Sequence, residues 1–345
     1  MTVESTRPDA SAPRRVVVRA PNWLGDAVLA LPAMSALRRA YPDAALTIAA
    51  VPAVAPMFRE LTDVRPDAVV AVETGNERDV LATGRFDTIV LLPNSFRSAW
   101  VAKQAGIAER WGYRAGARGW LLTRAIARPS GSVHQADYYR YLVRALGIDV
   151  PDSAPSIRAS AATVARADEI LQAHGAGAGR PLVGMAPGAA YGHAKRWPPR
   201  RVAEVVRMLT ADPGATCVLI GAAGDRQAGR EIESALPRSG VHVVDLIGRT
   251  DLRALIGVLS RCAAFVSNDS GAMHLAAATG VPVTAIFGPT NERATAPIGD
   301  HDVLVHPVFC RPCMLRDCPI DHRCMKGISA ETVAGRVRAR LARVE

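Results

Sequence analysis

The sequence has no uninterrupted run of eighteen apolar residues and almost no lysine. Without such a run, no transmembrane helix is expected. The first thirteen residues, MTVESTRPDASAP, lack the apolar stretch of a secretory signal, so we expect a disordered tail at 1–13 and a cytoplasmic protein. The chain is 49% hydrophobic and 21% charged, which is typical of a globular protein, and its 345 residues suit two domains.

The three lysines are Lys103, Lys195 and Lys326, so the net charge of +10 is carried almost wholly by arginine. Such a charge favours an anionic partner: a nucleic acid, a phosphorylated sugar or an acidic membrane face. An arginine-rich bias can also follow from genome composition alone. The sequence has no RNA-binding signature and no basic block with interleaved aromatics, so a nucleic-acid partner is not expected.

The most informative stretch is Phe265–Thr290, FVSNDSGAMHLAAATGVPVTAIFGPT. Its pattern predicts a buried strand, a polar turn, a helix and a second strand. In doubly wound α/β sheets, ligands bind at the carboxyl ends of strands, and a helix N-terminus there suits a phosphate. The turn and helix start hold Asp269, Ser270, Gly271 and His274, where packing needs none of them. We interpret the unit as the cradle of a phosphorylated donor; an ordinary βαβ unit without a ligand is the alternative.

The start of the chain repeats this pattern. Arg15–Ala20 is a valine-rich strand, a turn follows it, and Ala27–Ala40 carries the apolar stripe of a helix. The turn lacks the GxGxxG spacing, so dinucleotide binding is not supported. Asp26 stands where the turn meets the helix. The pattern leaves two interpretations open: an N-cap residue, or a carboxylate that faces a cleft and acts as a general base.

The clearest break in the chain is the glycine-rich segment AHGAGAGRP, which ends at Pro181. It suits an interdomain linker. We therefore expect an N-terminal, acceptor-side domain at 14–174, a linker at 175–181, a donor-binding domain at 182–328 and a C-terminal helix at 329–345. The second half opens with a strand, the glycine-rich loop PGAAYGHAKRWP and a helix. Lys195 in this loop could offset the charge of a diphosphate, or it could be a solvated surface lysine.

Four of the six cysteines lie in one polar segment, HPVFCRPCMLRDCPIDHRC: Cys310, Cys313, Cys318 and Cys324. A CxxC followed by two more cysteines is ligand-like spacing for zinc, although the later gaps are not those of a common zinc finger. Reduced thiols in a compact loop are the alternative, because disulfides are rare in the cytosol. The spacing therefore leaves a structural zinc site open.

Four pieces of this sequence together resemble glycosyltransferase family 9, the bacterial heptosyltransferases. They are PNWLGDAVLALPA at 21–33, PGAAYGHAKRWP at 187–198, SNDSGAMHLAAATGVPVTAIFGPT at 267–290 and CRPCMLRDCP at 310–319. The pieces keep the family's order and extend over most of the chain. The resemblance implies an α/β fold of the GT-B type, with two Rossmann-like domains that face a central cleft. It also implies that the last helix packs back toward the N-terminal domain.

The resemblance implies an activity as well: inverting transfer of heptose from ADP-L-glycero-D-manno-heptose, with no cofactor required for the chemistry. The cysteine-rich piece points to members that extend the first heptose of the lipopolysaccharide inner core. Such an enzyme would be peripheral to the inner membrane, where its anionic acceptor lies. The alternatives are a family member that adds a different heptose, a GT-B epimerase acting on a UDP-sugar, and a nucleotide-sugar-binding module without catalysis.

Individual roles follow from the matched motifs. Asp26 matches the family's proposed catalytic base, and Lys195 matches the residue that binds the donor's phosphates. Asp269 would hold sugar hydroxyls, while Ser270 and Gly271 would offer hydrogen bonds to the diphosphate. The remaining substrate-binding residues that the resemblance implies are His274, Gly188, Asn22 and Gly25.

Overall fold

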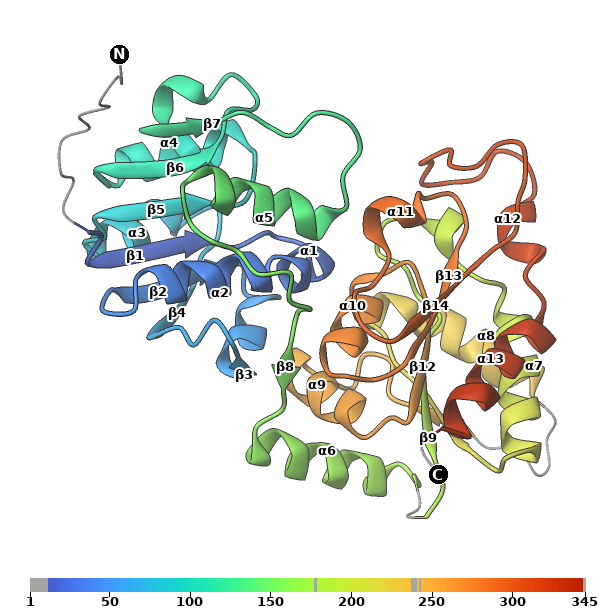
Figure 1. Ribbon diagram of the computed structural model, residues 1–345. Coiled ribbons are helices and arrows are strands. Elements are labelled where there is room, and N and C mark those ends of the chain that lie inside the picture. Colours follow the sequence, from blue (N-terminus) through green and yellow to red (C-terminus); the bar gives the residue numbers. More distant parts are fainter. Residues whose placement is uncertain (1–11, 177–178, 237–240, 242, 344–345) are drawn as a thin grey trace.

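The computed structural model describes residues 12–176, 179–236, 241 and 243–343. These residues form two α/β domains (Figure 1), each built on a parallel sheet of six strands. The prediction of two Rossmann-like domains is confirmed. Most of the expected tail at 1–13, and residues 177–178 of the expected linker, lie outside the described residues. Among the described residues, no helix combines the length and the hydropathy that crossing a membrane requires.

The first sheet has the strand order β4-β2-β1-β5-β6-β7. Its strands are β1 (Arg15–Arg19), β2 (Ala45–Ala50), β4 (Ala68–Ala71), β5 (Thr88–Leu91), β6 (Glu109–Tyr113) and β7 (Arg124–Ile126). All neighbouring pairs are parallel. Because side chains alternate along a strand, Val16 and Val18 of β1 face one side of the sheet and Val17 faces the other.

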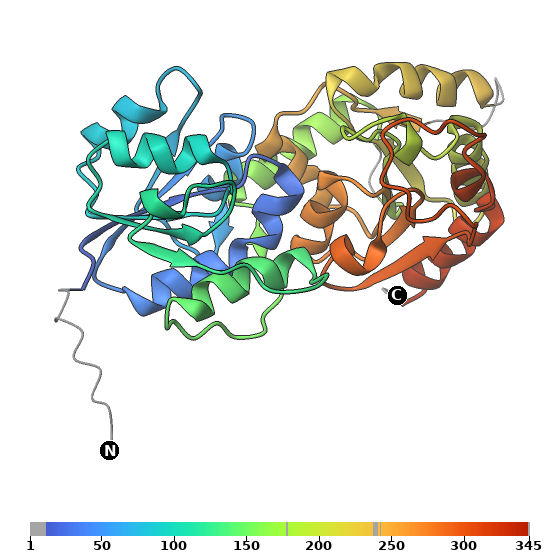
Figure 2. The ribbon, with the colours of Figure 1, turned by 90° about the horizontal axis from the view of Figure 1, so that it is seen from above.

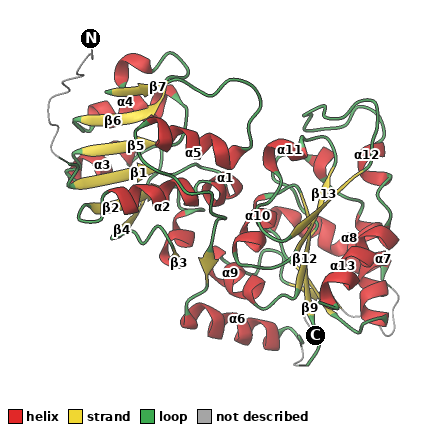
Figure 3. Cartoon of the chain, viewed as in Figure 1, coloured by secondary structure: helices red, strands yellow, loops and turns green. Residues whose placement is uncertain are grey.

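Helices cover both faces of this sheet (Figures 1 and 3). On the side of Val16 and Val18 lie α1 (Leu24–Leu29), α2 (Leu31–Ala40) and α5 (Gln135–Ala145). On the side of Val17 lie α3 (Glu77–Thr83) and α4 (Phe96–Gln104). Two short 3-10 helices, η1 (Ala55–Arg59) and η2 (Gly119–Leu121), complete the domain. Burial of both faces explains why the strands read as continuous apolar runs.

The second sheet has the order β11-β10-β9-β12-β13-β14. Its strands are β9 (Leu182–Ala186), β10 (Thr216–Leu219), β11 (Val243–Asp245), β12 (Ala264–Asn268), β13 (Val283–Phe287) and β14 (His301–Val305). Its domain contains the helices α7 (Pro199–Ala211), α8 (Arg226–Ala235), α9 (Leu252–Ser260), α10 (Gly271–Ala278), α11 (Glu292–Thr295), α12 (Arg323–Lys326) and α13 (Ala330–Leu341), with η3 (His193–Lys195) and η4 (Ala223–Asp225). Numbered from its own first strand, each sheet reads 3-2-1-4-5-6, the Rossmann order.

The expected helix over Ala27–Ala40 is two helices. Ala30 ends α1 and precedes α2, and Pro32 occupies the first turn of α2. Proline has no N–H to bond to the carbonyl four residues earlier, so one continuous helix would lose a hydrogen bond there and clash with its ring. The break gives the short helix α1 its own direction at the end of β1.

Two expectations about the domain boundary are wrong. The last helix, α13, does not return to the first domain; it packs on α7 and on strands β12 and β13 of the second domain. Instead α6 (Ala161–Ala173), which the sequence placed in the first domain, packs on α9 of the second (Figures 1 and 2). The two helices can approach closely because Gly257 of α9 has no side chain. A Cβ at that position would lie only 2.6 Å from the carbonyl oxygen of Thr163. The chain therefore changes domains before α6 and not at 175–181.

The buried side chain of Glu60 holds the segment where the chain passes from the first domain to the second. Glu60 follows η1 in the first domain, next to the small antiparallel pair β3 (Leu61–Thr62) and β8 (Ile157–Arg158). Its carboxylate accepts hydrogen bonds from the backbone N–H of Ser160 at 2.7 Å, Thr163 Oγ1 at 2.7 Å and Arg253 Nε at 2.5 Å. Because Arg253 belongs to α9, one fully buried carboxylate ties the first domain to α6 and to the second domain.

Candidate active site

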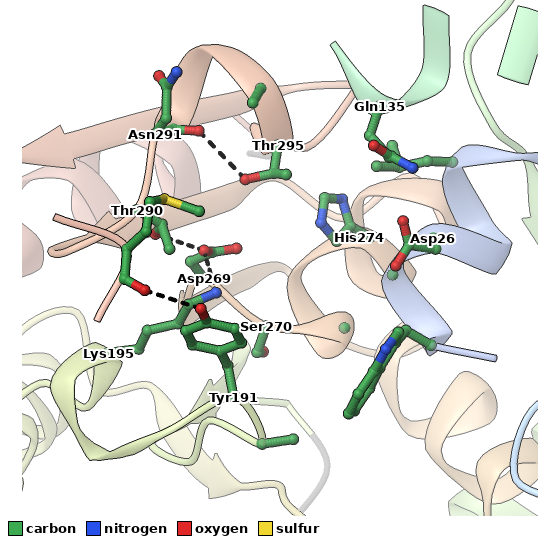
Figure 4. Close-up of a pocket in the computed structure, with 17 residues that line it drawn as sticks. Asp26, Gln135, Tyr191, Lys195, Asp269, Ser270, His274, Thr290, Asn291 and Thr295 are labelled. Carbon is green, nitrogen blue, oxygen red and sulfur yellow. Dashed lines mark hydrogen bonds and ion pairs between the residues drawn. The ribbon is translucent and has the colours of Figure 1, made fainter. Parts of the chain in front are cut away.

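The candidate site lies where the fold predicts a ligand, at the carboxyl ends of the central strands of both sheets. A cavity of about 370 Å³ is lined by residues of both domains (Figure 4). Asp26 follows β1, Lys195 follows β9 and Asp269 follows β12. The predicted residues that line the cavity are Gly25, Asp26, Lys195, Asp269, Ser270, Gly271 and His274.

Asp26 lies in the first turn of α1 and reaches the cavity from the first domain. It does not cap this helix, because the N-cap position belongs to Trp23. Tyr139 of α5 donates its hydroxyl hydrogen bond to Asp26 Oδ1 over 3.2 Å. Burial raises the pKa of Asp26, and the hydrogen bonds from Tyr139 and Gln135 partly oppose that rise. A carboxylate with a raised pKa is a stronger base than an exposed one.

The opposite side of the cavity holds a buried ion pair. Lys195 Nζ donates to Asp269 Oδ2 over 2.6 Å, and Thr290 Oγ1 donates to the same oxygen over 2.6 Å. Both members of the pair are about nine-tenths buried. Lys195 Nζ also lies 4.6 Å from the centre of the Tyr191 ring, within cation–π range. Lys195 is thus held at the cavity wall and is not a solvated surface lysine.

Helix α10 points its N-terminus at the cavity. Its N-cap residue, Ser270, makes no side-chain bond to the helix, and its hydroxyl lies 3.1 Å from Ser267 Oγ. Free N–H groups at such a helix start attract anions. One turn further on, burial lowers the pKa of His274 to about 4, so its imidazole is neutral at neutral pH. Within the described residues, His274 Nδ1 has no hydrogen-bond partner.

The two domains meet inside the site through two glycines. A Cβ at Gly271 of α10 would lie 3.0 Å from Leu24 Cβ and 3.2 Å from the backbone nitrogen of Gly25. A Cβ at Gly25 of α1 would lie 2.8 Å from His274 Cδ2. The start of α1 and the start of α10 can therefore touch only because neither glycine carries a side chain. This contact is a role for Gly25 and Gly271 that the sequence did not indicate.

Two of the implied substrate-binding residues do not line this cavity. The side chain of Asn22 accepts a hydrogen bond of 2.9 Å from Arg19, which is itself bonded to the buried Glu77. Gly188 lies beside Asp225, whose carboxylate would be 2.1–2.3 Å from a Cβ at this position. Asn22 is therefore bonded within its own loop, and Gly188 packs against Asp225.

The sequence also missed residues that complete the site. Tyr139 and Gln135 lie on α5, for which the sequence predicted no functional role. Thr290 lies beyond β13 and was not assigned a role. Figure 4 shows Asp26 and Gln135 on one side of the pocket and Lys195, Asp269 and Thr290 on the other. Only the fold brings these segments together, since Tyr139 lies 113 positions from Asp26.

The cysteine-rich segment forms a wall of the same cavity. Met314 lines it, and the carbonyl of Met314 accepts a hydrogen bond of 2.9 Å from the Tyr191 hydroxyl. The carbonyl of Arg316 accepts one of 2.9 Å from the N–H of Ala194, next to Lys195. Residues 310–319 thus support the loop that carries Lys195.

The cysteines of this segment do not form a recognisable metal site. Within the part of the chain that the structure describes, no group of three or more His, Cys, Asp or Glu side chains is close enough to hold a metal ion. Cys318 accepts a hydrogen bond from the N–H of His322 over 3.3 Å. Burial raises the pKa of Cys318, but backbone hydrogen bonds to its sulfur outweigh this and lower that pKa overall. The structural zinc, one of the two interpretations that the sequence left open, therefore keeps its support in the spacing of the cysteines alone.

Comparison with known proteins agrees with this geometry. The family model of glycosyltransferase family 9 (heptosyltransferase) matches residues 78–323. The chain belongs to glycosyltransferase family 9. It is 32% identical over 302 residues to lipopolysaccharide heptosyltransferase 2 of Escherichia coli, covering 82% of this chain and 85% of that protein. It is 30% identical over 304 residues to lipooligosaccharide heptosyltransferase 2 of Haemophilus influenzae, covering 84% and 88%.

Solved structures of the family share the fold. The structure of E. coli ADP-heptose lps heptosyltransferase II matches with a TM-score of 0.83 and 28% identity, covering 95% of this chain and 99% of that one. The GT-B arrangement expected from the sequence is therefore confirmed, and the chain is a glycosyltransferase. Asp26 lies ahead of the residues that the family model matches, so its role rests on the geometry of the cavity.

Proposed function

We propose that this family 9 glycosyltransferase transfers heptose from ADP-L-glycero-D-manno-heptose to the first heptose of the lipopolysaccharide inner core, with inversion. The relatives named above support this choice of donor and acceptor. The observation that carries the proposal is the makeup of one cavity. A half-buried carboxylate from the first domain faces a lysine, an acid and a helix N-terminus of the second.

In the proposed mechanism, Asp26 accepts the proton of the acceptor hydroxyl while the hydroxyl oxygen forms a bond to the anomeric carbon. The bond from that carbon to the phosphate oxygen breaks on the opposite face, and ADP leaves with the electron pair. Inversion requires this arrangement, because the base and the leaving group must lie on opposite sides of the sugar. The raised pKa of Asp26, caused by its burial, makes it a better proton acceptor.

Charge on the departing ADP is offset by the second domain. We assign the diphosphate to Lys195 and to the N-terminus of α10 at Ser270 and Gly271. Lys195 keeps a bond to Asp269, and its two other N–H donors can turn toward phosphate oxygens. Asp269, oriented by Thr290, can accept hydrogen bonds from sugar hydroxyls on its remaining oxygen.

The proposed chemistry uses only groups of the chain, and no cofactor takes part in it. A structural zinc on Cys310, Cys313, Cys318 and Cys324 is a separate hypothesis that only their spacing in the sequence supports. Elemental analysis of the purified protein decides it: about one zinc per chain would support the hypothesis, and an absence of bound metal would contradict it.

The deciding experiment incubates the protein with ADP-heptose and a core acceptor that ends at its first heptose, followed by mass spectrometry of the acceptor. Transfer adds one heptose residue and releases ADP. Release of heptose or an epimerised sugar without acceptor would favour the epimerase. ADP-heptose binding without product would favour a binding module. Product formed only on an acceptor that lacks all heptose would identify a family member of different specificity.

A further inference from the structure

Three aromatic side chains form an exposed cluster on the first domain, which we call the aromatic knob: Phe96, Trp100 and Trp120. Their exposed fractions are 43%, 39% and 64%. The ring centres lie 6.2–6.4 Å apart, so the rings pack on each other while their outer edges meet solvent. Clustered exposed aromatics of this kind mark an interaction surface. None of the three lines the active-site cavity.

The knob is held in place by a buried arginine. Phe96 and Trp100 lie four residues apart on α4 and so share one face of the helix, whereas Trp120 comes from η2. The guanidinium of Arg118 is fully buried and donates to the carbonyls of Pro93 at 2.5 Å and Ser95 at 3.1 Å, just before α4. Arg118 therefore ties η2 to the start of α4, which fixes Trp120 beside the other two rings.

Cationic side chains lie on the segment that carries the knob. Lys103 Nζ lies 4.9 Å from the centre of the Trp120 ring. From residue 93 to residue 123, the segment that carries the knob, five basic residues stand against a single acid, Glu109. Arg97, Lys103 and Arg114 are exposed. Tryptophan beside lysine and arginine is the combination found at membrane–water interfaces, where the rings enter the headgroup layer and the cations meet lipid phosphates.

We propose that the aromatic knob, together with Lys103, docks this protein on a bilayer that contains anionic phospholipids. The charge complementarity selects anionic lipid over a neutral surface. Insertion of three rings together with electrostatic attraction provides the two signals that reversible membrane binding needs.

The aromatic knob lies in the same domain as Asp26 and near the same edge of its sheet. Helix α4 follows β5, the neighbour of β1, so the knob lies near the same carboxyl edge of the sheet as Asp26. Docking there would place the acceptor-side domain at the lipid headgroups, where the sugars of a membrane-anchored acceptor begin. This part of the inference rests on the proposed function. Vesicle binding itself is measured without donor or acceptor, so the two proposals can fail separately.

The test is flotation of the full-length protein with vesicles of phosphatidylglycerol and phosphatidylethanolamine, compared with phosphatidylcholine alone. We expect binding to the anionic vesicles that weakens as salt is raised. The double variant Trp100→Ser/Trp120→Ser should bind about tenfold or more weakly, and Lys103→Gln about fivefold more weakly. Trp120→Ser alone, at the most exposed of the three rings, should show an intermediate loss if the double variant folds poorly.

Matched controls come from sites away from the knob. Leu61→Ser removes a side chain that is 55% exposed near β3, at the other end of the first domain in Figure 1, and should leave vesicle binding unchanged. Arg230→Gln removes an exposed charge on α8 of the second domain and should do the same. The knob variants should keep wild-type turnover on a delipidated acceptor and lose it on a vesicle-embedded one.

Three results would overturn the proposal. One is equal binding of the wild type and the knob variants to anionic vesicles. Another is equal binding of the wild type to phosphatidylcholine and to anionic vesicles. The third is a change in the sedimentation mass of the Trp120→Ser variant without a change in vesicle binding, because it would identify the knob as a contact between copies of this chain.

Discussion

Lys195 Nζ lies 2.6 Å from Asp269 Oδ2, so the cation that we assign to the donor's diphosphate is paired with the acid that we assign to the donor's sugar. The pair couples the two ends of the donor. Lys195 keeps its bond to Asp269 while its two other N–H donors turn to the phosphates, and Asp269 offers its second oxygen to sugar hydroxyls, so the loss of either side chain would displace the other. The proposed roles are therefore not independent.

Replacing Lys195 with methionine should weaken donor binding. The variant loses its point charge toward the diphosphate and leaves Asp269 buried without its ion-pair partner. We expect ADP-heptose affinity to fall by about ten- to a hundredfold, as measured by titration calorimetry. Lys326→Met is the matched control, because Lys326 is exposed on α12. Equal donor affinity of the Lys195→Met variant and the wild type would remove Lys195 from the donor site.

Asp26→Asn should abolish turnover and spare nucleotide binding. The amide keeps the size and most hydrogen bonds of the carboxylate but cannot accept the proton, so kcat should fall by about 10²- to 10⁴-fold. ADP affinity should stay within about twofold because the nucleotide is assigned to the second domain. Asp63→Asn, at an exposed position of the same domain, is the control for a general charge effect. Near-normal transfer by Asp26→Asn would show that another group is the base.

Tyr139→Phe should move the pH dependence of kcat/KM to higher pH. The Tyr139 hydroxyl stabilises the charged form of Asp26 and so lowers its pKa against the larger effect of burial. Without this bond the pKa of Asp26 rises further. The acidic limb of kcat/KM, where activity appears as the base ionises, should therefore move to higher pH. A purely structural role would lower activity at every pH and leave the position of the limb unchanged.

Glu60→Gln should destabilise the protein in a pH-dependent way. Burial would raise the pKa of Glu60, but its bonds to Ser160, Arg253 and Thr163 outweigh that effect and hold the pKa below its usual value. A depressed pKa stabilises the folded state above the unfolded-state pKa, and the gain is lost as pH falls through the acidic range. We expect the variant to lose about 1–3 kcal/mol of unfolding free energy at pH 7, and the difference to shrink toward pH 4.

Urea denaturation at the two pH values measures this difference. The control is Glu204→Gln, which breaks a half-exposed pair between Glu204 and Arg201 on the surface of α7. It should change stability by less than about 0.5 kcal/mol. A loss at Glu60 that is equal at both pH values would mean that its ionisation does not contribute.

Much of the fold could be predicted because buried parallel strands leave a plain signal. The strands Leu182–Ala186 and Val283–Phe287 lie where the sequence predicted strands, since an apolar run between a turn and a glycine-rich loop admits few alternatives. The strand His301–Val305 was missed because it is an edge strand that is only partly buried and carries a histidine and an aspartate. The position of α6 could not be read from the sequence, because an amphipathic helix does not encode which domain it packs on.

Site residues could be predicted where a single short segment showed both a strand and the polar turn that follows it. Asp26 and the 269–274 turn follow strands directly, so local pattern placed them at the ligand edge. Tyr139 gave no such signal, because a tyrosine on an amphipathic helix has the same pattern whether its hydroxyl meets solvent or a distant carboxylate. The support that residues 310–319 give to the Lys195 loop runs through backbone carbonyls, which any sequence could supply.

Gly25 and Gly271 set the spacing between the two domains at the active site. Because backbone meets backbone there, a methyl group at either position would push the helix that carries Asp26 away from the helix start that faces the anion. Even an alanine at position 25 or 271 would therefore widen the gap between the proposed base and the donor.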